Sequence, residues 1–292
     1  MADCPFAGPI GSARFVIHYA FERELVRGRP VRGDVRIPEG PPPRSAVLVL
    51  HGFKGFKDWA FFPHLCQRLA ASGHAVVSFN FSGSGIGSDP ERFTELEAFA
   101  ANTLSRELEE VLCMADWIMA GDLLPRRPDR MGLVGHSRGG GDAILHTAAD
   151  PRVRALATWS AVSTFDRWNA ATQTEWREGG RIYVLNSRTG QQMPLDVGLL
   201  DDFEANRNAF DIEAAARRVT VPWLILHGAD DQTVEVDEAR TLARAAPDAR
   251  LRVLAGAGHT YEVGHPFAGA SPALEEAVAA TADHLALHLG GE

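Results

Sequence analysis

The sequence has few cysteines, no excess of basic residues and no long hydrophobic run, and each absence excludes a class of protein. The three cysteines, Cys4, Cys66 and Cys113, are odd in number and far apart, so we expect reduced thiols rather than a disulfide framework. We expect Cys66 and Cys113 to be buried. No stretch approaches the roughly 18 apolar residues of a membrane-spanning helix, and the N-terminal residues do not resemble a signal peptide. We therefore expect a cytoplasmic protein.

The charge balance argues against polyanionic partners. Lysine and arginine number 29 against 38 aspartates and glutamates, which gives a net charge of −9. Because binding to a phosphate backbone depends on a basic surface, we expect no nucleic-acid partner and no membrane association. Histidine, cysteine and acidic residues do not recur at metal-ligand spacing, and the glycine-rich loop 82–88 lacks the spacing of a phosphate-binding loop. We expect no metal and no other cofactor.

Short apolar runs alternate with amphipathic segments along most of the chain. The expected strands are 14–19, 31–37, 46–50, 75–79, 131–134, 153–159, 223–226 and 250–254, and the expected helices are 59–72, 95–120, 142–149, 236–246 and 272–289. This alternation predicts an α/β fold with a parallel sheet covered by helices on both faces. We expect a single domain over 1–292. Residues 163–210 are too poor in periodic apolar positions to form a core of their own, so they form a small cap insertion with a β-hairpin at 181–195.

A serine follows one of the buried strands in a glycine-rich turn. Residues 135–139 read GHSRG, which fits the pattern G-x-S-x-G. Between a strand and a helix, this pattern predicts a sharp turn that lifts Ser137 above the sheet as a nucleophile. The alternative is an ordinary glycine-rich turn with a solvated serine. The strand before it and the helix after it favour the nucleophile.

A serine hydroxyl needs a base, and the base needs an orienting carboxylate. His259 follows the last strand at the same sheet edge, and we expect it to accept the serine proton. His265 is the rival base, while His136 is expected to pack on the other side of the turn. Asp230 and Asp231 both follow the strand at 223–226, and the residues alone leave open which of them orients His259.

The expected oxyanion donors are the backbone N–H groups of Phe53 and Arg138, because both lie in turns that follow strands. Lys54, next to Phe53, is expected to be solvated. Three indoles, Trp159, Trp168 and Trp176, lie in or under the insertion and are candidates for substrate binding. The alternative is that these rings only pack the insertion onto the sheet.

Together these residues resemble the α/β-hydrolase superfamily over nearly the full chain. The matching pieces are 51–52 (HG), 135–140 (GHSRGG), 227–231 (HGADD) and 256–259 (GAGH). The turn HGFKG, the loop 80–85 and the insertion resemble the dienelactone-hydrolase-like and cinnamoyl (feruloyl) esterase-like branch, which is also similar to prolyl-oligopeptidase-type catalytic domains. The resemblance implies a mostly parallel eight-stranded sheet and acyl-enzyme chemistry, and its register assigns the orienting role to Asp231.

The expected function is that of a carboxylesterase-type serine hydrolase with the triad Ser137, Asp231 and His259 and a small-molecule ester as substrate. Dienelactone hydrolases proper carry a cysteine where this chain has Ser137, so an ordinary ester is favoured. Two alternatives remain: a serine peptidase or amidase with the same triad, and a non-catalytic binding protein with a hydrolase fold. The sequence leaves open whether the chain forms a homo-oligomer.

Overall fold

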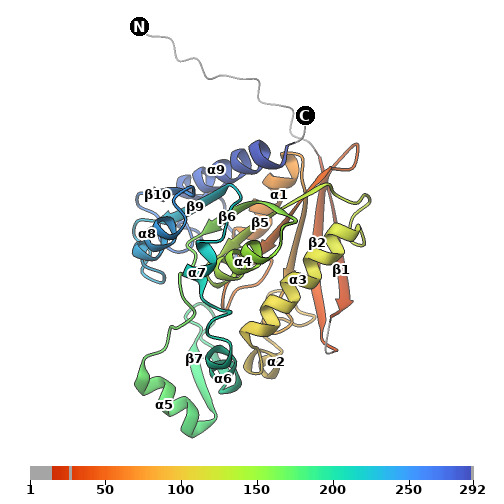
Figure 1. Cartoon of the computed structure of the whole chain (residues 1–292). Coiled ribbons are helices and arrows are strands. Elements are labelled where there is room, and N and C mark those ends of the chain that lie inside the picture. The colour runs from red at the N-terminus through yellow and green to blue at the C-terminus, as the bar shows by residue number, and fades with distance from the viewer. Residues whose placement is uncertain (1–14, 26–27, 291–292) are drawn as a thin grey trace.

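A twisted central sheet organises the molecule (Figure 1). The computed structural model describes residues 15–25 and 28–290. Within that part of the chain, eight strands form the sheet in the order β1-β2-β4-β3-β5-β6-β9-β10. The strands are β1 (Val16–Glu24), β2 (Pro30–Pro38), β3 (Ser45–Leu50), β4 (Ala75–Asn80), β5 (Arg130–His136), β6 (Val153–Trp159), β9 (Trp223–Gly228) and β10 (Arg250–Leu254). β2 pairs antiparallel with β1 and β4, and the other pairs are parallel.

Helices cover both faces of this sheet because its central strands are apolar on both sides. Every residue of β3, β4 and β9 is buried. On one face, α1 (Phe62–Ala71) contacts α9 (Pro272–Leu289), and α9 packs on β5, β6 and β9. On the other face lie α3 (Leu104–Ala120), α4 (Arg138–Ala149) and α8 (Val236–Ala245). The expected α/β fold with a mostly parallel eight-stranded sheet is confirmed.

One expected helix is two helices in the structure. The apolar period predicted a single helix over 95–120, but α2 (Leu96–Ala100) ends before α3 begins at Leu104. Thr103 has an extended backbone, with φ −137°, and its side chain accepts a hydrogen bond from the Arg106 N–H. A threonine in this role is an N-cap, which starts a new helix inside a continuous apolar pattern.

The segment 163–210 lies beyond the edge of the sheet that carries the carboxyl ends of its parallel strands (Figure 1). It contains α5 (Ala170–Gly179), β7 (Arg181–Leu185), β8 (Gln192–Asp196) and α6 (Gly198–Ala205), after which α7 (Ile212–Ala216) leads back to β9. β7 and β8 pair antiparallel as a separate two-stranded sheet. The single-domain assignment with this segment as a cap stays a prediction.

Two cysteines and the longer helices can be compared with the expectations. Cys66 is buried as expected, whereas Cys113 is only half-buried on α3. Cys4 lies outside the described residues.

None of the helices that the structure describes is long and apolar enough to cross a bilayer. The described residues also hold no group of three or more histidine, cysteine or acidic side chains placed to bind a metal ion.

Helix α3 buries a carboxyl group against the loop after β4. Glu110 is 5% exposed and accepts hydrogen bonds from the Ser82 N–H, at 2.8 Å, and from the Ser82 hydroxyl. Burial disfavours the carboxylate more than these hydrogen bonds favour it, and it raises the pKa of Glu110 to about 7. Because this folded-state pKa exceeds the unfolded value, Glu110 costs stability once it ionises.

The free energy of unfolding is therefore highest below about pH 4.5, where Glu110 is neutral in the folded and the unfolded protein. It falls as the pH rises through about 7, where Glu110 ionises in the folded protein. We expect wild-type protein to lose roughly 3 kcal/mol of unfolding free energy between pH 4 and pH 8 relative to Glu110→Gln. Urea unfolding of both proteins at several pH values measures this difference. The exposed Glu91→Gln variant is the matched control. Parallel pH profiles for wild type and Glu110→Gln would contradict the assignment.

Candidate active site

Ser137 occupies a strained turn between β5 and α4. Its backbone has φ 57° and ψ −122°, a conformation that residues with a side chain rarely adopt. Hydrogen bonds to β6 and the chain after it hold this conformation. The Ser137 N–H donates to the Trp159 carbonyl at 2.9 Å, and the Ser137 carbonyl accepts from Val162 N–H at 3.2 Å. The expected strand–turn–helix setting of the G-x-S-x-G pattern is present.

Glycines surround this turn because backbone segments cross at short distance there. A Cβ atom on Gly135 would lie 2.2 Å from the Gly139 carbonyl oxygen, and one on Gly139 would lie 2.4 Å from the His51 carbonyl oxygen. A Cβ on Gly52 would lie 2.8 Å from the Ser137 Cβ. The turn after β3 therefore rests directly against the serine, and no larger residue fits at these positions.

His259 and Asp231 form a hydrogen-bonded pair beside the serine. The Asp231 Oδ2 atom lies 2.8 Å from the His259 Nδ1, and the Oδ1 atom accepts from the N–H groups of Thr233 and Val234, both at 2.9 Å. Burial alone would raise the pKa of Asp231, but the hydrogen bond and charge of His259 and the two amides outweigh it and lower the pKa to about 2. A carboxylate at Oδ2 fixes the proton of His259 on Nδ1 and leaves Nε2 as an acceptor.

The structure also separates the rival residues. Asp230 is exposed in the same turn, whereas Asp231 is 5% exposed. The His265 Nδ1 accepts from the Ala60 N–H at 3.1 Å, and its ring packs on Phe56, away from the pocket that contains Ser137. The residues brought together are Ser137, Asp231 and His259.

Two histidines support this pair, a role that the sequence pattern did not indicate. His136 Nε2 lies 2.9 Å from the His259 carbonyl oxygen, and burial lowers the pKa of His136 well below its usual value, so the neutral ring donates there. The fully buried His227 lies with its Nε2 2.8 Å from the Val234 carbonyl oxygen and 3.5 Å from Asp231 Oδ2. The sequence held a signal for both roles: His136 directly precedes the serine, and His227 lies at the end of β9.

The two expected oxyanion donors adjoin the serine. Neither the Phe53 N–H nor the Arg138 N–H has a hydrogen-bond acceptor within the described residues. Arg138 is the first residue of α4, where backbone N–H groups lack partners inside the helix. The Arg138 guanidinium lies 4.3 Å from the Phe53 ring centroid, and its Nη1 lies 3.4 Å from Glu107 Oε1. These side-chain contacts fix the two turns relative to each other.

A pocket of about 320 Å³ opens onto Ser137 and His259. Its other lining residues come from the turn after β3, from the start of α4, from the insertion and from the loop after β9. They are Phe53, Lys54, Arg138, Val162, Thr164, Phe165, Arg167, Trp168, Asn186, Ser187, Arg188, Thr233 and Val234. Lys54 was expected to be solvated, but it is half-buried in this lining. Among the three candidate indoles, Trp168 lines the pocket.

The structure places Trp159 and Trp176 outside the pocket, contrary to their expected role in substrate binding. Both side chains are 0% exposed, and neither lines the pocket. Trp159 donates its indole N–H to the Thr281 hydroxyl at 2.9 Å, under the sheet, and Trp176 donates to the Leu195 carbonyl at 2.8 Å, inside the insertion. An indole whose N–H is satisfied within the protein acts as a packing group.

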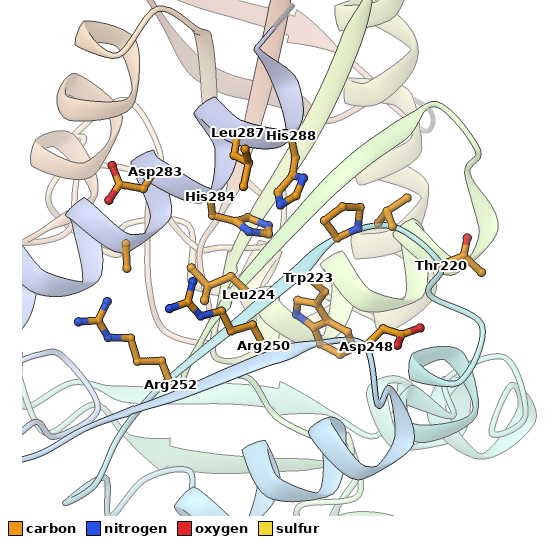
Figure 2. A pocket seen from close by; sticks show the side chains of 13 residues that line it. Thr220, Trp223, Leu224, Asp248, Arg250, Arg252, Asp283, His284, Leu287 and His288 are labelled. Atoms are coloured by element: carbon orange, nitrogen blue, oxygen red, sulfur yellow. The ribbon is translucent and has the colours of Figure 1, made fainter.

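A larger cavity, of about 530 Å³, lies at the opposite end of β9 and β10 (Figure 2). Trp223 and Arg250, the first residues of these two strands, line it together with His284 and His288 of α9. Asp231 and His259 follow the other ends of the same strands. The two cavities share no lining residue, and the smaller pocket, which contains Ser137 and His259, is the candidate active site.

The sheet order, the elbow serine and the Asp–His pair at the carboxyl edge define an α/β hydrolase. The chain belongs to the Alpha/beta hydrolase family, whose sequence profile matches residues 47–279. The expected superfamily is confirmed.

Among curated relatives, the 2,6-dihydropseudooxynicotine hydrolase of Paenarthrobacter nicotinovorans is 27% identical over 240 residues, which is 79% of this chain and 56% of that protein. The chain spans about half the length of the curated relatives it matches first. Among solved structures, Est1E from Butyrivibrio proteoclasticus has a TM-score of 0.68 at 17% identity and covers 93% of this chain and 99% of its own. The esterase domain of a Rhodothermus marinus protein has a TM-score of 0.64 at 20% identity, and the match covers 94% of this chain and 100% of that one. These structures share the fold of the chain.

The hydrogen bonds of Asp231 give a prediction about stability. Because the pKa of Asp231 is lowered on folding, its carboxylate adds to the free energy of unfolding above about pH 4. This stabilisation is lost as the pH falls through about 2. We expect Asp231→Asn to lower the free energy of unfolding at pH 7 by roughly 2 kcal/mol. The exposed neighbour supplies the control, since Asp230→Asn is expected to change the free energy by less than about 0.5 kcal/mol. Equal losses in the two variants, measured by urea unfolding, would refute the assignment.

Proposed function

We propose that this hydrolase is a carboxylesterase that uses Ser137 as its nucleophile. The observation that carries the proposal is the convergence of a strained serine and a carboxylate-held imidazole on one pocket. His259 Nε2 takes the proton of Ser137 as the hydroxyl attacks the ester carbonyl. Asp231 keeps the other imidazole proton on Nδ1 and stabilises the imidazolium that forms.

The negative charge of the tetrahedral intermediate develops on the carbonyl oxygen. The N–H groups of Phe53 and Arg138, which have no acceptor within the described residues, are the donors for this oxygen. His259 then gives its proton to the leaving alcohol, and an acyl-serine remains. Water, activated by the same imidazole, hydrolyses the acyl-serine and returns Ser137 to its starting state.

The pocket supports small esters with an apolar group. Phe53, Phe165 and Trp168 supply aromatic surface, and about 320 Å³ accommodates a small ligand. A solved structure of Est1E has ferulic acid bound to it. An amidase uses the same triad, so the ester assignment depends on comparing the two substrate classes directly.

Ser137→Ala tests the nucleophile. We expect the variant to fold like wild type and to lose turnover of para-nitrophenyl butyrate by roughly 10⁴-fold or more, because the acyl-enzyme cannot form. A fluorophosphonate probe, read by mass spectrometry, is expected to add once to wild type on Ser137 and not to the variant. Retention of more than about a tenth of the activity would reject the nucleophile.

The same assay separates the remaining candidates. Asp231→Asn is expected to lower turnover by roughly 10⁴-fold, while the exposed Asp230→Asn keeps it within about twofold. Faster turnover of aminoacyl anilides than of nitrophenyl esters would identify an amidase. A folded wild-type protein that neither reacts with the probe nor hydrolyses either class would be a binding protein.

Trp168 and Trp176 form a matched pair for the insertion, since their rings pack edge to face at 4.9 Å but only Trp168 lines the pocket. Trp168→Ala is expected to change the ratio of acetate to butyrate ester turnover severalfold with little loss of stability. Trp176→Ala is expected to leave the ratio unchanged and to cost roughly 3 kcal/mol of stability, because its buried ring is removed. Turnover ratios and melting temperatures of both variants check this, and the reverse pattern would show that Trp176 is the binding residue.

A further inference from the structure

The candidate active site is lined by positive charge, although the chain as a whole carries a net charge of −9. Four cationic side chains line the pocket, namely Lys54, Arg138, Arg167 and Arg188, and none of the aspartates and glutamates that the structure describes lines it. Two of them are neutralised by carboxylates behind the pocket wall. Arg138 pairs with Glu107, and Arg167 pairs with Glu238.

Lys54 and Arg188 have no carboxylate partner within the described residues. The Lys54 ammonium donates to the Leu185 carbonyl at 3.0 Å, and an Arg188 Nη1 donates to the Lys54 carbonyl at 3.4 Å. The Arg188 guanidinium lies 4.5 Å from the Trp59 ring centroid. Burial lowers the pKa of both groups, and the charge of Arg188 lowers that of Lys54 further. Two mutually repelling cations are therefore held near each other in the lining of the pocket.

A third donor lies beside them in the loop between β7 and β8. Asn186 is 2% exposed and lines the same pocket. Its Oδ1 accepts from the Arg188 N–H at 3.2 Å, which fixes the orientation of the amide, while its Nδ2 has no acceptor within the described residues. A buried donor without an acceptor is costly, and so are two partly buried cations without a counter-charge.

We propose that the hydrolase takes an ester that carries a second, free carboxylate, and that Lys54 and Arg188 bind this carboxylate with Asn186 beside them. The proposal rests on the proposed esterase function and names its substrate class. A carboxylate next to Lys54 and Arg188 supplies the counter-charge that both cations lack. The ester group itself lies against Ser137, and the apolar group of the substrate contacts Phe165 and Trp168.

Matched esters test the charge and also show on which side of the ester it lies. For the acyl side, the mono-para-nitrophenyl ester of adipic acid is compared with the same ester of adipic monoamide. For the alcohol side, para-acetoxybenzoate is compared with para-acetoxybenzamide. Each pair has nearly equal size, and rates are corrected for spontaneous hydrolysis. We expect kcat/KM of wild type to favour the carboxylate by roughly 10-fold or more in one pair, as for charge-assisted hydrogen bonds.

Variants assign that preference to the two cations. In Lys54→Met and in Arg188→Met, the carboxylate-to-amide ratio is expected to fall by about 10-fold, mainly through KM. Arg177→Gln removes one positive charge from α5, where Arg177 pairs with Asp201 and Glu204 away from the pocket, and it is expected to keep the wild-type ratio. A drop in Arg177→Gln equal to that in Arg188→Met would attribute the preference to net charge and overturn the proposal.

The outcomes also distinguish this proposal from the esterase function beneath it. If wild type is labelled by the fluorophosphonate at Ser137 and hydrolyses carboxylate and amide esters equally, the carboxylate site is refuted and the esterase stands. If wild type is neither labelled nor active on any of the four esters, the esterase is refuted, and the carboxylate site falls with it. A preference that survives both Lys54→Met and Arg188→Met would refute the assignment to these residues.

Discussion

The positive-φ backbone of Ser137 is held by hydrogen bonds to the end of β6 and to the chain after it, and the other groups of the site are placed relative to it. A residue in such a conformation costs about 1–3 kcal/mol, so it persists only where its surroundings enforce it. The Trp159 carbonyl and the Val162 N–H do this from one side. From the other side, the turn at Gly52 rests on the serine Cβ, and the next residue, Phe53, lines the same pocket as Arg138.

The parallel register of β9 and β10 then brings Asp231 and His259 to the same edge of the sheet. Asp231 follows β9 and His259 follows β10, so neighbouring strands present them at hydrogen-bonding distance although 28 positions separate them in the sequence. His227 and His136 complete the support from below. The hydrogen bond between Asp231 and His259 thus depends on strand pairing, and the loops only carry the side chains.

Most of the fold and the core of the site could be predicted from the sequence because their signals are local. Buried strands are continuous apolar runs, and the serine turn has a fixed pattern. The placement of Trp159 and Trp176 could not be predicted, since the direction of an indole depends on partners such as Thr281 and Leu195 that lie far along the chain. The same holds for Lys54, whose surroundings include Leu185, and for Glu107, whose burial depends on contact with α4. The break between α2 and α3 had a local signal in Thr103, which the apolar period masked.

The glycines packed beneath Ser137 cannot be replaced by larger residues, whereas the loop between β7 and β8 can accept other residues. Any side chain at Gly52, Gly135 or Gly139 would collide with main-chain atoms or with the serine itself. These three glycines must therefore be kept when the pocket is redesigned. The loop that carries Asn186 and Arg188 joins two short strands outside the main sheet, so it can be exchanged without moving Ser137. For an engineer who wants a new substrate range on this scaffold, that loop is the place to graft.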